Sequence, residues 1–303
     1  MARPSKYGEL QTELFAFPAE NLAARLKNLE PFMGTAWFSM EKSHRTEPIR
    51  HEYQKYWVEI NGGPEGIATY WDQDILLFAY SQIISSLNKG DEVSRKIHFT
   101  GPDLFRFTGQ KWQGSKDYAA VVKALRRLQG TTIRTNIKPV GDILHAEMGV
   151  SWIEQYESFL SDNVTTFSIV LPETFYNVLN QRKNWLTLDH SYFSIMGGLE
   201  RFLYTWGRKS TGFKNDDTWE ESFNSIYEKS GSRMKPAKFR HKLRGIIRNQ
   251  TLPGYVLEEI FDIKKGPSLS LKRDVRHPLL LSTKKIRKSK LSRRSDSQLN
   301  LPI

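Results

Sequence analysis

The chain has 303 residues, a mass of 35.2 kDa, 45 Lys and Arg against 33 Asp and Glu, and no Cys. The length predicts two domains, and the lack of Cys excludes disulfides, zinc fingers, iron–sulfur clusters and thiol nucleophiles. A net charge of +12 favours a polyanionic partner, and no apolar run approaches the ~20 residues of a membrane span. We therefore expect a cytoplasmic protein that is not inserted in a membrane.

Residues 1–31 predict an N-terminal leader with one short amphipathic helix, from Pro18 to about Leu29. Aromatic and β-branched residues then predict strands over Trp37–Met40 and Tyr53–Ile60. A turn is expected at Asn61–Pro64.

Residues 32–163 form the first predicted domain. After those two strands, the predicted order is a helix over Trp71–Leu87, a strand over Arg95–Thr100, helices over Pro102–Phe107 and Ser115–Gln129, and a hairpin of Thr131–Ile137 with Gly149–Phe159. Ser115 is expected to cap its helix at the N-terminus, and Gly130 to close it as a C-cap residue.

Residues 164–275 form the second predicted domain. Its predicted order is a strand over Thr166–Leu171, a helix over Pro172–Gln181, an extended segment over Trp185–Leu188, helices over Gly198–Arg208, Thr218–Lys229 and Pro236–Arg248, and a hairpin of Tyr255–Ile263 with Ser268–Asp274. Helix, turn, helix and hairpin is the order of a winged helix, and it occurs twice. The expected fold class is α+β, with two tandem winged-helix domains and a flexible basic tail over 276–303.

The positive charge is concentrated in two segments. Residues 229–249 carry eight basic side chains and no acidic one, and residues 276–303 carry eight against a single Asp. These segments hold +15 together, so the other 254 residues hold −3. Such a distribution indicates a nucleic acid or, less favourably, an anionic membrane surface as the partner. For the tail alone, a solvated charge run remains an open alternative.

The helix over 236–248 carries the candidate base-reading surface. At 100° per residue, Phe239, Leu243, Ile246 and Ile247 form one apolar stripe, which leaves the basic residues on the other side and its flanks. A helix of this kind fits the major groove of B-DNA, which is about 12 Å wide. The base-reading set is Lys235, Lys238, Arg240, His241, Lys242, Arg244, Gly245 and Arg248. Gly245 indicates a close approach to a ligand, or is merely tolerated.

Two further surfaces are candidates for DNA contact. The hairpin carries Lys264, Lys265, Lys272 and Arg273, which we expect on phosphates, although an ordinary solvent-facing hairpin remains an alternative. In the first domain the candidates for phosphate contact or for a dimer surface are Ser115, Lys116, Lys123, Arg126, Arg127 and Arg134.

The sequence lacks the common signatures of catalysis. There is no phosphate-binding G-x-x-x-x-G-K-[ST] loop, no G-x-S-x-G motif and no pair of His at metal-ligand spacing. Asp72 and Asp74 open a helix, where carboxylates complement the dipole, although they could also hold a divalent ion. His241, Arg244 and Tyr255 resemble the residues of tyrosine recombinases, but Tyr255 follows Arg244 too closely in the sequence for strand-transfer chemistry. We expect no enzyme activity, no metal and no cofactor.

Five blocks of sequence resemble the replication initiator protein A family of bacterial plasmids. They are GIATYWDQDIL at 66–76, RKIHFTGPDLFR at 95–106, YAAVVKALRRLQGTTI at 118–133, YFSIMGGLERFLYTWGR at 192–208 and YEKSGSRMKPAKFRHKLR at 227–244. Similarity runs from about Trp37 to Tyr255. The chain departs from the family pattern at Met196–Gly198, where a proline-bearing turn is more usual, and in the tail after 275.

The resemblance implies a bacterial replication initiator with two winged-helix domains. Such proteins bind repeated origin sites in double-stranded DNA, promote local opening of the duplex and recruit the host initiator and replicative helicase. Many also repress their own promoter as homodimers, and so contribute to copy control. A transcriptional repressor without origin function, or a strand-transfer or nicking enzyme, are the rival interpretations.

Overall fold

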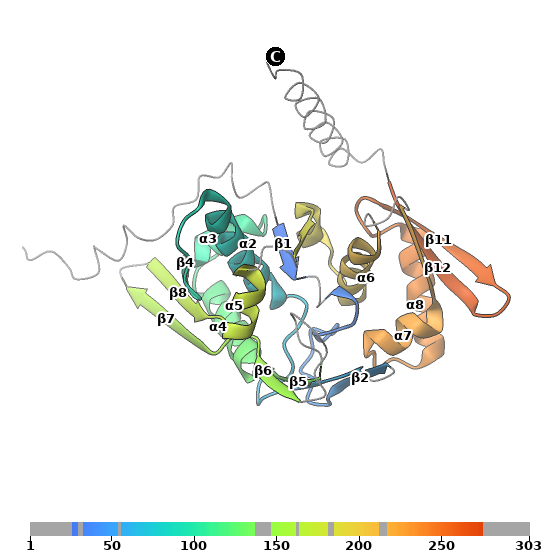
Figure 1. The fold of residues 1–303 in the computed structure, drawn as a ribbon, viewed down its shortest axis with the longest axis horizontal. Coiled ribbons are helices and arrows are strands. Elements are labelled where there is room, and N and C mark those ends of the chain that lie inside the picture. The colour runs from blue at the N-terminus through green and yellow to red at the C-terminus, as the bar shows by residue number, and fades with distance from the viewer. Residues whose placement is uncertain are drawn as a thin grey trace, which may run out of the picture.

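A computed structural model describes residues 26–29, 33–53, 56–136, 147–161, 164–180, 185–211 and 217–274 (Figure 1). The predicted basic tail over 276–303, most of the predicted leader helix and the loop between the strands of the first predicted hairpin lie outside these residues.

The helices and strands before residue 171 are β1 (Leu26–Leu29), β2 (Ile49–Tyr53), β3 (Tyr56–Asn61), α2 (Gln73–Lys89), β4 (Lys96–Thr100), α3 (Gly101–Phe107), α4 (Ser115–Gly130), β5 (Thr132–Thr135), β6 (Met148–Ser151), β7 (Gln155–Ser161) and β8 (Val164–Val170). Those after it are α5 (Glu173–Asn180), β9 (Trp185–Leu188), the 3-10 helix η2 (His190–Ser194), α6 (Gly198–Ser210), β10 (Thr218–Ser222), α7 (Phe223–Ser230), α8 (Pro236–Asn249), β11 (Tyr255–Asp262) and β12 (Gly266–Arg273).

One order of elements occurs twice in this mixed α and β architecture. The first repeat runs α2, β4, α3, α4, β7, β8 and builds an antiparallel sheet in the order β4-β8-β7. The second runs α6, β10, α7, α8, β11, β12 and builds an antiparallel sheet in the order β10-β12-β11. Each repeat is therefore helix, strand, helix, helix and hairpin, with the last strand at the centre of its sheet.

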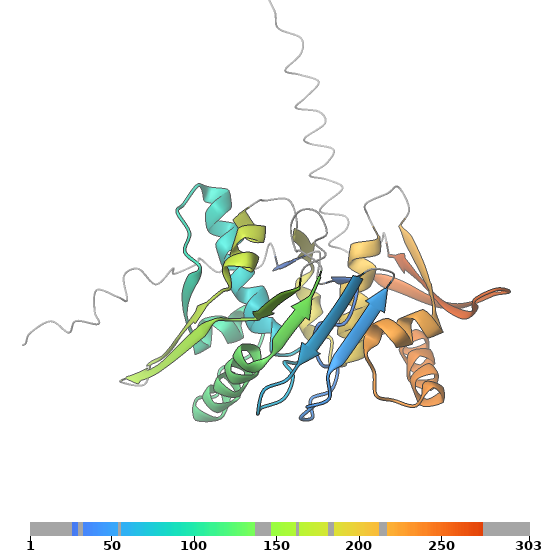
Figure 2. The same ribbon diagram turned by 60° about the horizontal axis from the view of Figure 1, so that its bottom comes forward.

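The hairpin of the first repeat is β7–β8, not the predicted pair over 131–159. The predicted strand over Gly149–Phe159 is two strands, because Trp152 and Ile153 turn into the core between β6 and β7, and Trp152 stacks on Phe38 with ring centroids 4.3 Å apart. Strands β5 and β6 do pair with each other, but they belong to the four-stranded sheet β2-β3-β5-β6 between the repeats (Figure 2). The boundary expected between residues 163 and 164 thus falls inside the β7–β8 hairpin.

The predicted helix over Thr218–Lys229 is the strand β10 followed by the short helix α7. Trp219 fits helical spacing with Phe223, but in β10 it packs on Trp206 of α6 with ring centroids 4.6 Å apart. Ser222 ends the strand and caps α7, because its hydroxyl accepts the N–H of Ser225 at 3.1 Å.

Three predictions near the N-terminus are wrong at the level of elements. Residues 26–29 of the predicted leader helix form β1, which pairs with β9 so that Leu26 faces Leu188. The strand predicted over Tyr53–Ile60 is β2 and β3, which pair with each other. Trp37–Met40 contains only an isolated bridge from Ser39 to Thr69.

The ends of α4 also differ from expectation. Gly114, at φ 84°, is the N-cap in place of Ser115, and no side chain caps the helix there. Gly130 is the last helical residue and not a C-cap in the left-handed region. It lies next to Gly63, where an added Cβ would be 3.0 Å from the Gly130 carbonyl oxygen, so this close contact favours a glycine at position 63.

The first turn of α2 holds two buried carboxylates in ion pairs, one within the first repeat and one to the second. The Asp72 carboxylate accepts a hydrogen bond from Nη2 of Arg127 on α4 at 2.6 Å. The Asp74 carboxylate accepts one from Nη1 of Arg201 on α6 at 2.7 Å. Burial raises the pKa of Asp74 to about 6, since Arg201 offsets the lost solvation only in part. Burial alone would lower the pKa of Arg201, but Asp74 and Tyr192 outweigh it and raise that pKa. Both carboxylates are therefore paired with arginines and have a structural role at the start of α2.

Candidate nucleic-acid interface

Helix α8 buries the predicted stripe. Phe239 and Leu243 are fully buried and Ile246 is 3% exposed, while Ile247 is half-buried. Phe239 packs edge-on against Tyr227 of α7, with ring centroids 5.1 Å apart. The sequence predicted this face because the apolar residues recur at helical spacing.

Both ends of α8 are fixed by local chemistry. Pro236 stands at the first helical position, where its missing N–H has no partner to lose. At the other end Gln250 adopts a left-handed conformation with φ 49°. Its side-chain amide donates to the carbonyls of Ile247 and Leu257, both at 2.7 Å, and accepts the N–H of Leu257 at 2.9 Å. The last turn of α8 is thereby tied to strand β11.

The outer side of α8 is basic and largely open. Lys235, Lys238, His241 and Arg248 are exposed, and Arg240 and Lys242 are half-exposed. Among the described residues, none of the five Lys and Arg in that set forms a salt bridge with a carboxylate. The surface is therefore a run of cations whose charge is not neutralised within this part of the chain.

Arg244 differs from the other cations of α8. Its Nε lies 3.0 Å from both carboxylate oxygens of Glu259 on β11, and its Nη2 donates to Oε1 at 2.8 Å. The hydrogen bond to Glu259 raises the pKa of Arg244. The guanidinium also lies over the ring of Phe223, 5.7 Å from its centroid. Sequence spacing predicted a free base-reading arginine, whereas the structure places it in an exposed ion pair.

Gly245 lies in a hollow on the outer side of α8. This hollow has a volume of about 420 Å3 and is lined by Glu200, Met234, Lys238, His241, Lys242, Gly245, Ile246, Asn249 and Thr251. A Cβ built on Gly245 would meet no atom within 4 Å. Packing within the chain therefore does not require this glycine.

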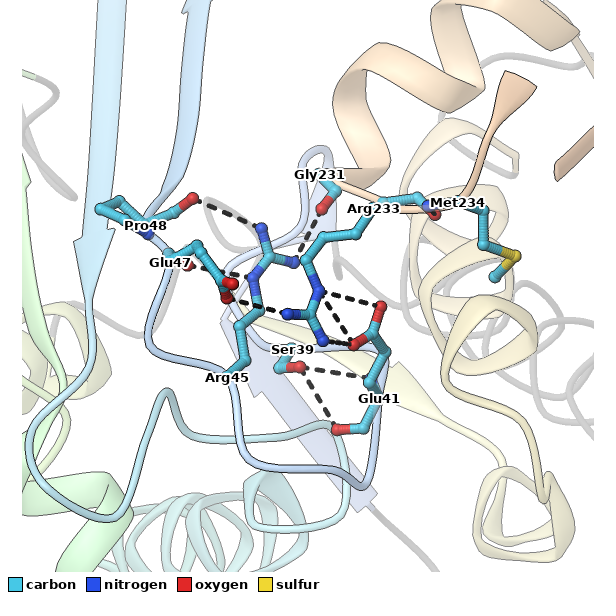
Figure 3. Close-up of polar contacts among 9 residues, drawn as sticks. Ser39, Glu41, Arg45, Glu47, Pro48, Gly231, Arg233 and Met234 are labelled. Carbon is cyan, nitrogen blue, oxygen red and sulfur yellow. Dashed lines mark hydrogen bonds and ion pairs between the residues drawn. The ribbon is translucent and has the colours of Figure 1, made fainter.

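The turn before α8 is clamped to the N-terminal part of the chain (Figure 3). Arg233 donates from Nη1 to Glu47 at 2.8 Å and also pairs with Glu41. Arg45, which is 6% exposed, donates to the carbonyl of Gly231 at 2.8 Å. Burial and the nearby charge of Arg233 lower the pKa of Arg45. Two cations of the basic segment 229–249 therefore stabilise the fold. They are Arg233 in this clamp and Lys229, which pairs with Glu221 at 3.4 Å.

The β11–β12 hairpin projects beyond α8 (Figures 1 and 2). Lys264 and Lys265 are exposed at its turn, and Lys272 is exposed on the returning strand. Arg273 instead pairs with Asp217 at 3.3 Å, and its backbone N–H donates to the Asp217 carbonyl at 2.8 Å. Three of the four predicted hairpin cations are therefore available for contact, and Arg273 anchors β10 to the sheet.

The predicted surface of the first repeat is more heavily paired. Ser115, Lys116 and Lys123 are exposed on α4. Arg126 lies 3.5 Å from Glu65, and a hydrogen bond with Tyr156 raises the pKa of Arg126. Arg134 of β5 pairs with Glu147 at 2.6 Å.

Arg127 is a scaffold residue and not a surface contact. Its guanidinium holds Asp72, whose side chain is 3% exposed, through hydrogen bonds of 2.7 and 2.6 Å. This pairing joins α4 to the start of α2. The sequence could not show it, because the partner lies 55 positions away.

Tyr255 and His241, two of the residues that resemble a strand-transfer set, lie in different surroundings. Tyr255 is 8% exposed and packs edge-on against Tyr204 with centroids 5.6 Å apart, while His241 is exposed on α8. Burial raises the pKa of Tyr255. Within the described ranges, no group of three or more His, Asp and Glu is placed to hold a metal ion. No described helix is both long and apolar enough to cross a bilayer.

The fold and the site define a class of protein in which two similarly built α/β repeats expose one basic helix beside a projecting hairpin. Residues 27–257 match the family model described as Replication initiator protein A. The chain is also 32% identical over 209 residues to the "Putative replication protein" of Wigglesworthia glossinidia brevipalpis, which covers 68% of this chain and 74% of that protein. The chain belongs to the replication initiator protein A family, as the five sequence blocks predicted.

Two solved structures of RctB domains share this fold. A crystal structure of domains 2 and 3 of RctB superposes with a TM-score of 0.60 at 11% identity, over 82% of this chain and 99% of that one. A second crystal structure of RctB domains 2–3 gives a TM-score of 0.51 at 12% identity, over 78% and 94%. At these identities the likeness establishes a shared fold alone.

Proposed function

We propose that this chain initiates plasmid replication by binding repeated sites in double-stranded origin DNA. Membership of the replication initiator protein A family supports this role. The protein then opens the neighbouring duplex and recruits the host initiator and helicase in the bacterial cytoplasm. It performs no catalysis of its own, so the work comes from binding energy that offsets deformation of the DNA.

Each repeat acts as a winged-helix domain. In the second repeat α7 and α8 form the helix-turn-helix, and the β11–β12 hairpin is the wing. Helix α8 enters the major groove, where Arg side chains bond guanine and Lys side chains meet phosphates. Lys264, Lys265 and Lys272 lie on phosphates beside that groove. Gly245 allows the backbone of α8 to approach the DNA closely.

The observation that carries this proposal is the sidedness of α8. One side is fully buried through Phe239 and Leu243, and the other exposes cations without carboxylate partners among the described residues. A surface helix without a binding partner could pair these cations with acidic side chains of the same protein, which are available.

The first repeat has a smaller part in DNA binding. Only Lys116 and Lys123 of its predicted cations are exposed without a salt bridge among the described residues. In Figure 2, α4 and α8 lie toward the same side of the molecule, at opposite ends. Helix α4 therefore adds backbone contacts on the same DNA, or it forms part of a homodimer surface.

The test is affinity for duplexes that tile the DNA around the coding region, with a random duplex as competitor. Lys238→Ala and Arg248→Ala each remove an exposed cation of α8, and Lys89→Ala removes an exposed cation at the far end of α2. We expect the two α8 variants to lose about 1–3 kcal/mol of specific affinity and Lys89→Ala to bind as wild type. Equal losses for all three variants, or none, would overturn the proposal.

The rival repressor function needs a second measurement, since a repressor would bind DNA through the same surface. A plasmid that carries the gene and its flanking DNA should be maintained with the wild-type protein and lost with Lys238→Ala. If the plasmid is maintained without the protein, a repressor function would explain the DNA binding instead.

A further inference from the structure

The tip of the β11–β12 hairpin exposes two large apolar side chains. Phe261 is 78% exposed and Ile263 is 95% exposed, and the other exposed large apolar side chains among the described residues are Met196 at 74% and Phe159 at 55%. Exposed apolar side chains gathered at one point mark an interaction site more often than scattered ones do. The described residues therefore leave this apolar pair uncovered, as an interaction site would.

The tip is ordered by its own hydrogen bonds. The β11–β12 ladder continues to the pairs of Phe261 with Pro267 and Asp262 with Gly266. The Asp262 carboxylate accepts the backbone N–H groups of Lys264 at 2.7 Å and Lys265 at 2.9 Å. Gly266 closes the turn at φ 73°, a conformation that favours glycine. The apolar pair is thus presented on a fixed edge.

The position of the tip is linked to α8. The Gln250 side chain bonds both the last turn of α8 and Leu257 of β11, in the strand that carries Phe261. Lys264 and Lys265 are exposed directly beside the apolar pair. A partner that contacts α8 and the tip together must offer negative charge with apolar surface between the charges.

The minor groove of DNA has this chemistry, because its walls are phosphates and its floor is stacked bases. We propose that Phe261 and Ile263 form an apolar wedge that enters the minor groove beside the α8 site and partly unstacks one base step. Lys264 and Lys265 hold the flanking phosphates. This inference rests on the proposed function, since it assumes that α8 binds duplex DNA.

A wedge of this kind would couple binding to opening of the duplex. Phe and Ile are among the side chains that other minor-groove proteins insert between base steps, where they kink the duplex by about 20–90°. Pyrimidine–purine steps such as TA unstack most easily, so we expect the wedge to act at one of them. The hairpin would then distort the duplex at one defined base step next to the specific site.

The test uses a duplex that contains the bound site, with 2-aminopurine placed in turn at each adenine under the hairpin. Fluorescence of this base rises when it is unstacked. The full-length wild-type protein should raise it at one position by at least twofold. The double variant Phe261→Thr/Ile263→Thr should lose that rise and bind about tenfold more weakly, with the same salt dependence as wild type. Both residues are exposed and threonine favours strands, so thermal unfolding should be unchanged.

The matched control is Lys264→Ala/Lys265→Ala. It should lower the slope of log K against log salt by about 2, since each phosphate contact contributes about 0.9. At saturating protein it should keep the fluorescence rise. The opposite behaviour of the two double variants would separate an apolar wedge from a simple phosphate contact.

Three results would overturn the wedge while leaving the proposed function standing, provided that Lys238→Ala still weakens specific binding. One is wild-type affinity in the threonine variant together with an unchanged signal. Another is specific binding by the wild-type protein without a fluorescence rise at any position. The third is a change of oligomeric state in the threonine variant with normal DNA binding, which would make the tip a protein contact. A wild-type protein that bound no duplex would instead overturn the proposed function itself.

Discussion

Replacing Arg127 by alanine tests whether this residue belongs to the scaffold or to the DNA-binding surface. The Asp72 carboxylate, 3% exposed, accepts Nε of Arg127 at 2.7 Å and Nη2 at 2.6 Å, and it also accepts the backbone N–H of Thr69 at 2.7 Å. The variant removes the only cation that the described structure pairs with this carboxylate and leaves a buried charge behind.

The expected loss in the free energy of unfolding is about 3 kcal/mol. Breaking a buried ion pair by removing one partner costs about 3–5 kcal/mol, and the lower end applies because Arg127 is 23% exposed and water can reach Asp72 from that side. Urea denaturation measures this loss. Arg127→Met combined with Asp72→Asn is the control, because it removes both charges and should recover part of the stability.

DNA affinity of the Arg127→Ala variant, measured well below its melting temperature, decides the question. A scaffold residue predicts affinity within about twofold of wild type for the folded protein. Unchanged stability together with a clear loss of affinity would refute the reasoning and return Arg127 to the DNA-binding set.

Three further predictions concern other charged groups. Glu259→Gln releases Arg244 from an exposed ion pair worth about 0.2–1 kcal/mol, so DNA affinity should rise by up to about fivefold, while Arg244→Ala should lower it. A loss of affinity in Glu259→Gln would mean that the carboxylate holds Arg244 in its binding pose. Burial raises the folded-state pKa of Asp74 to about 6 from 3.8, so this group's contribution to stability is complete below about pH 4 and is lost as the pH rises through 6. Relative to Asp74→Asn, the wild type should lose on the order of 3 kcal/mol of unfolding free energy between about pH 4 and pH 7, and a constant difference would contradict this. Deleting 276–303, which removes a charge of +7, should weaken binding to random duplex at low salt more than specific binding. Unchanged affinity would indicate that the tail is a targeting signal or a binding site for another partner.

Local sequence pattern was sufficient for the elements that carry their own signal. Helix α8 was predicted to within one residue, because Phe239, Leu243 and Ile246 recur at helical spacing and a proline marks its start. Helices α2, α3, α4 and α6 also lie where periodicity placed them, to within two residues at each end. In each of these helices the apolar spacing of neighbouring residues specifies the buried face.

Strands defined by distant partners could not be predicted in the same way. Thr218–Ser222 is a strand because it pairs with β12, about 50 positions further along the chain, while its own spacing fits a helix. The hairpin of the first repeat was missed because β5 and β6, which precede it, pair with each other, and β5 also pairs with β3 in a different sheet. Intrinsic preference over a few residues yields to such tertiary pairing.

The candidate site shows the same division. Spacing gave the outward direction of the α8 cations, since direction follows from the helix alone. Which cations of the segment 229–249 have carboxylate partners depends on residues in other elements, such as Glu259 for Arg244 and Glu41 for Arg233. The exposed apolar tip was also missed, because Phe261 and Ile263 fit the predicted strand and sequence alone does not show that the strand runs beyond the protein body.

The relative position of the two repeats follows from where the buried charges lie. Asp72 and Asp74 stand two positions apart in the first turn of α2, yet one binds α4 in the first repeat and the other binds α6 in the second. The Arg233 clamp adds a second connection at the start of α8. Moving one repeat against the other would have to separate the buried pair of Asp74 and Arg201, which is costlier than breaking a surface pair. The two basic helices are therefore held at one separation, and a DNA site that engages both must present its two contacts at one fixed spacing.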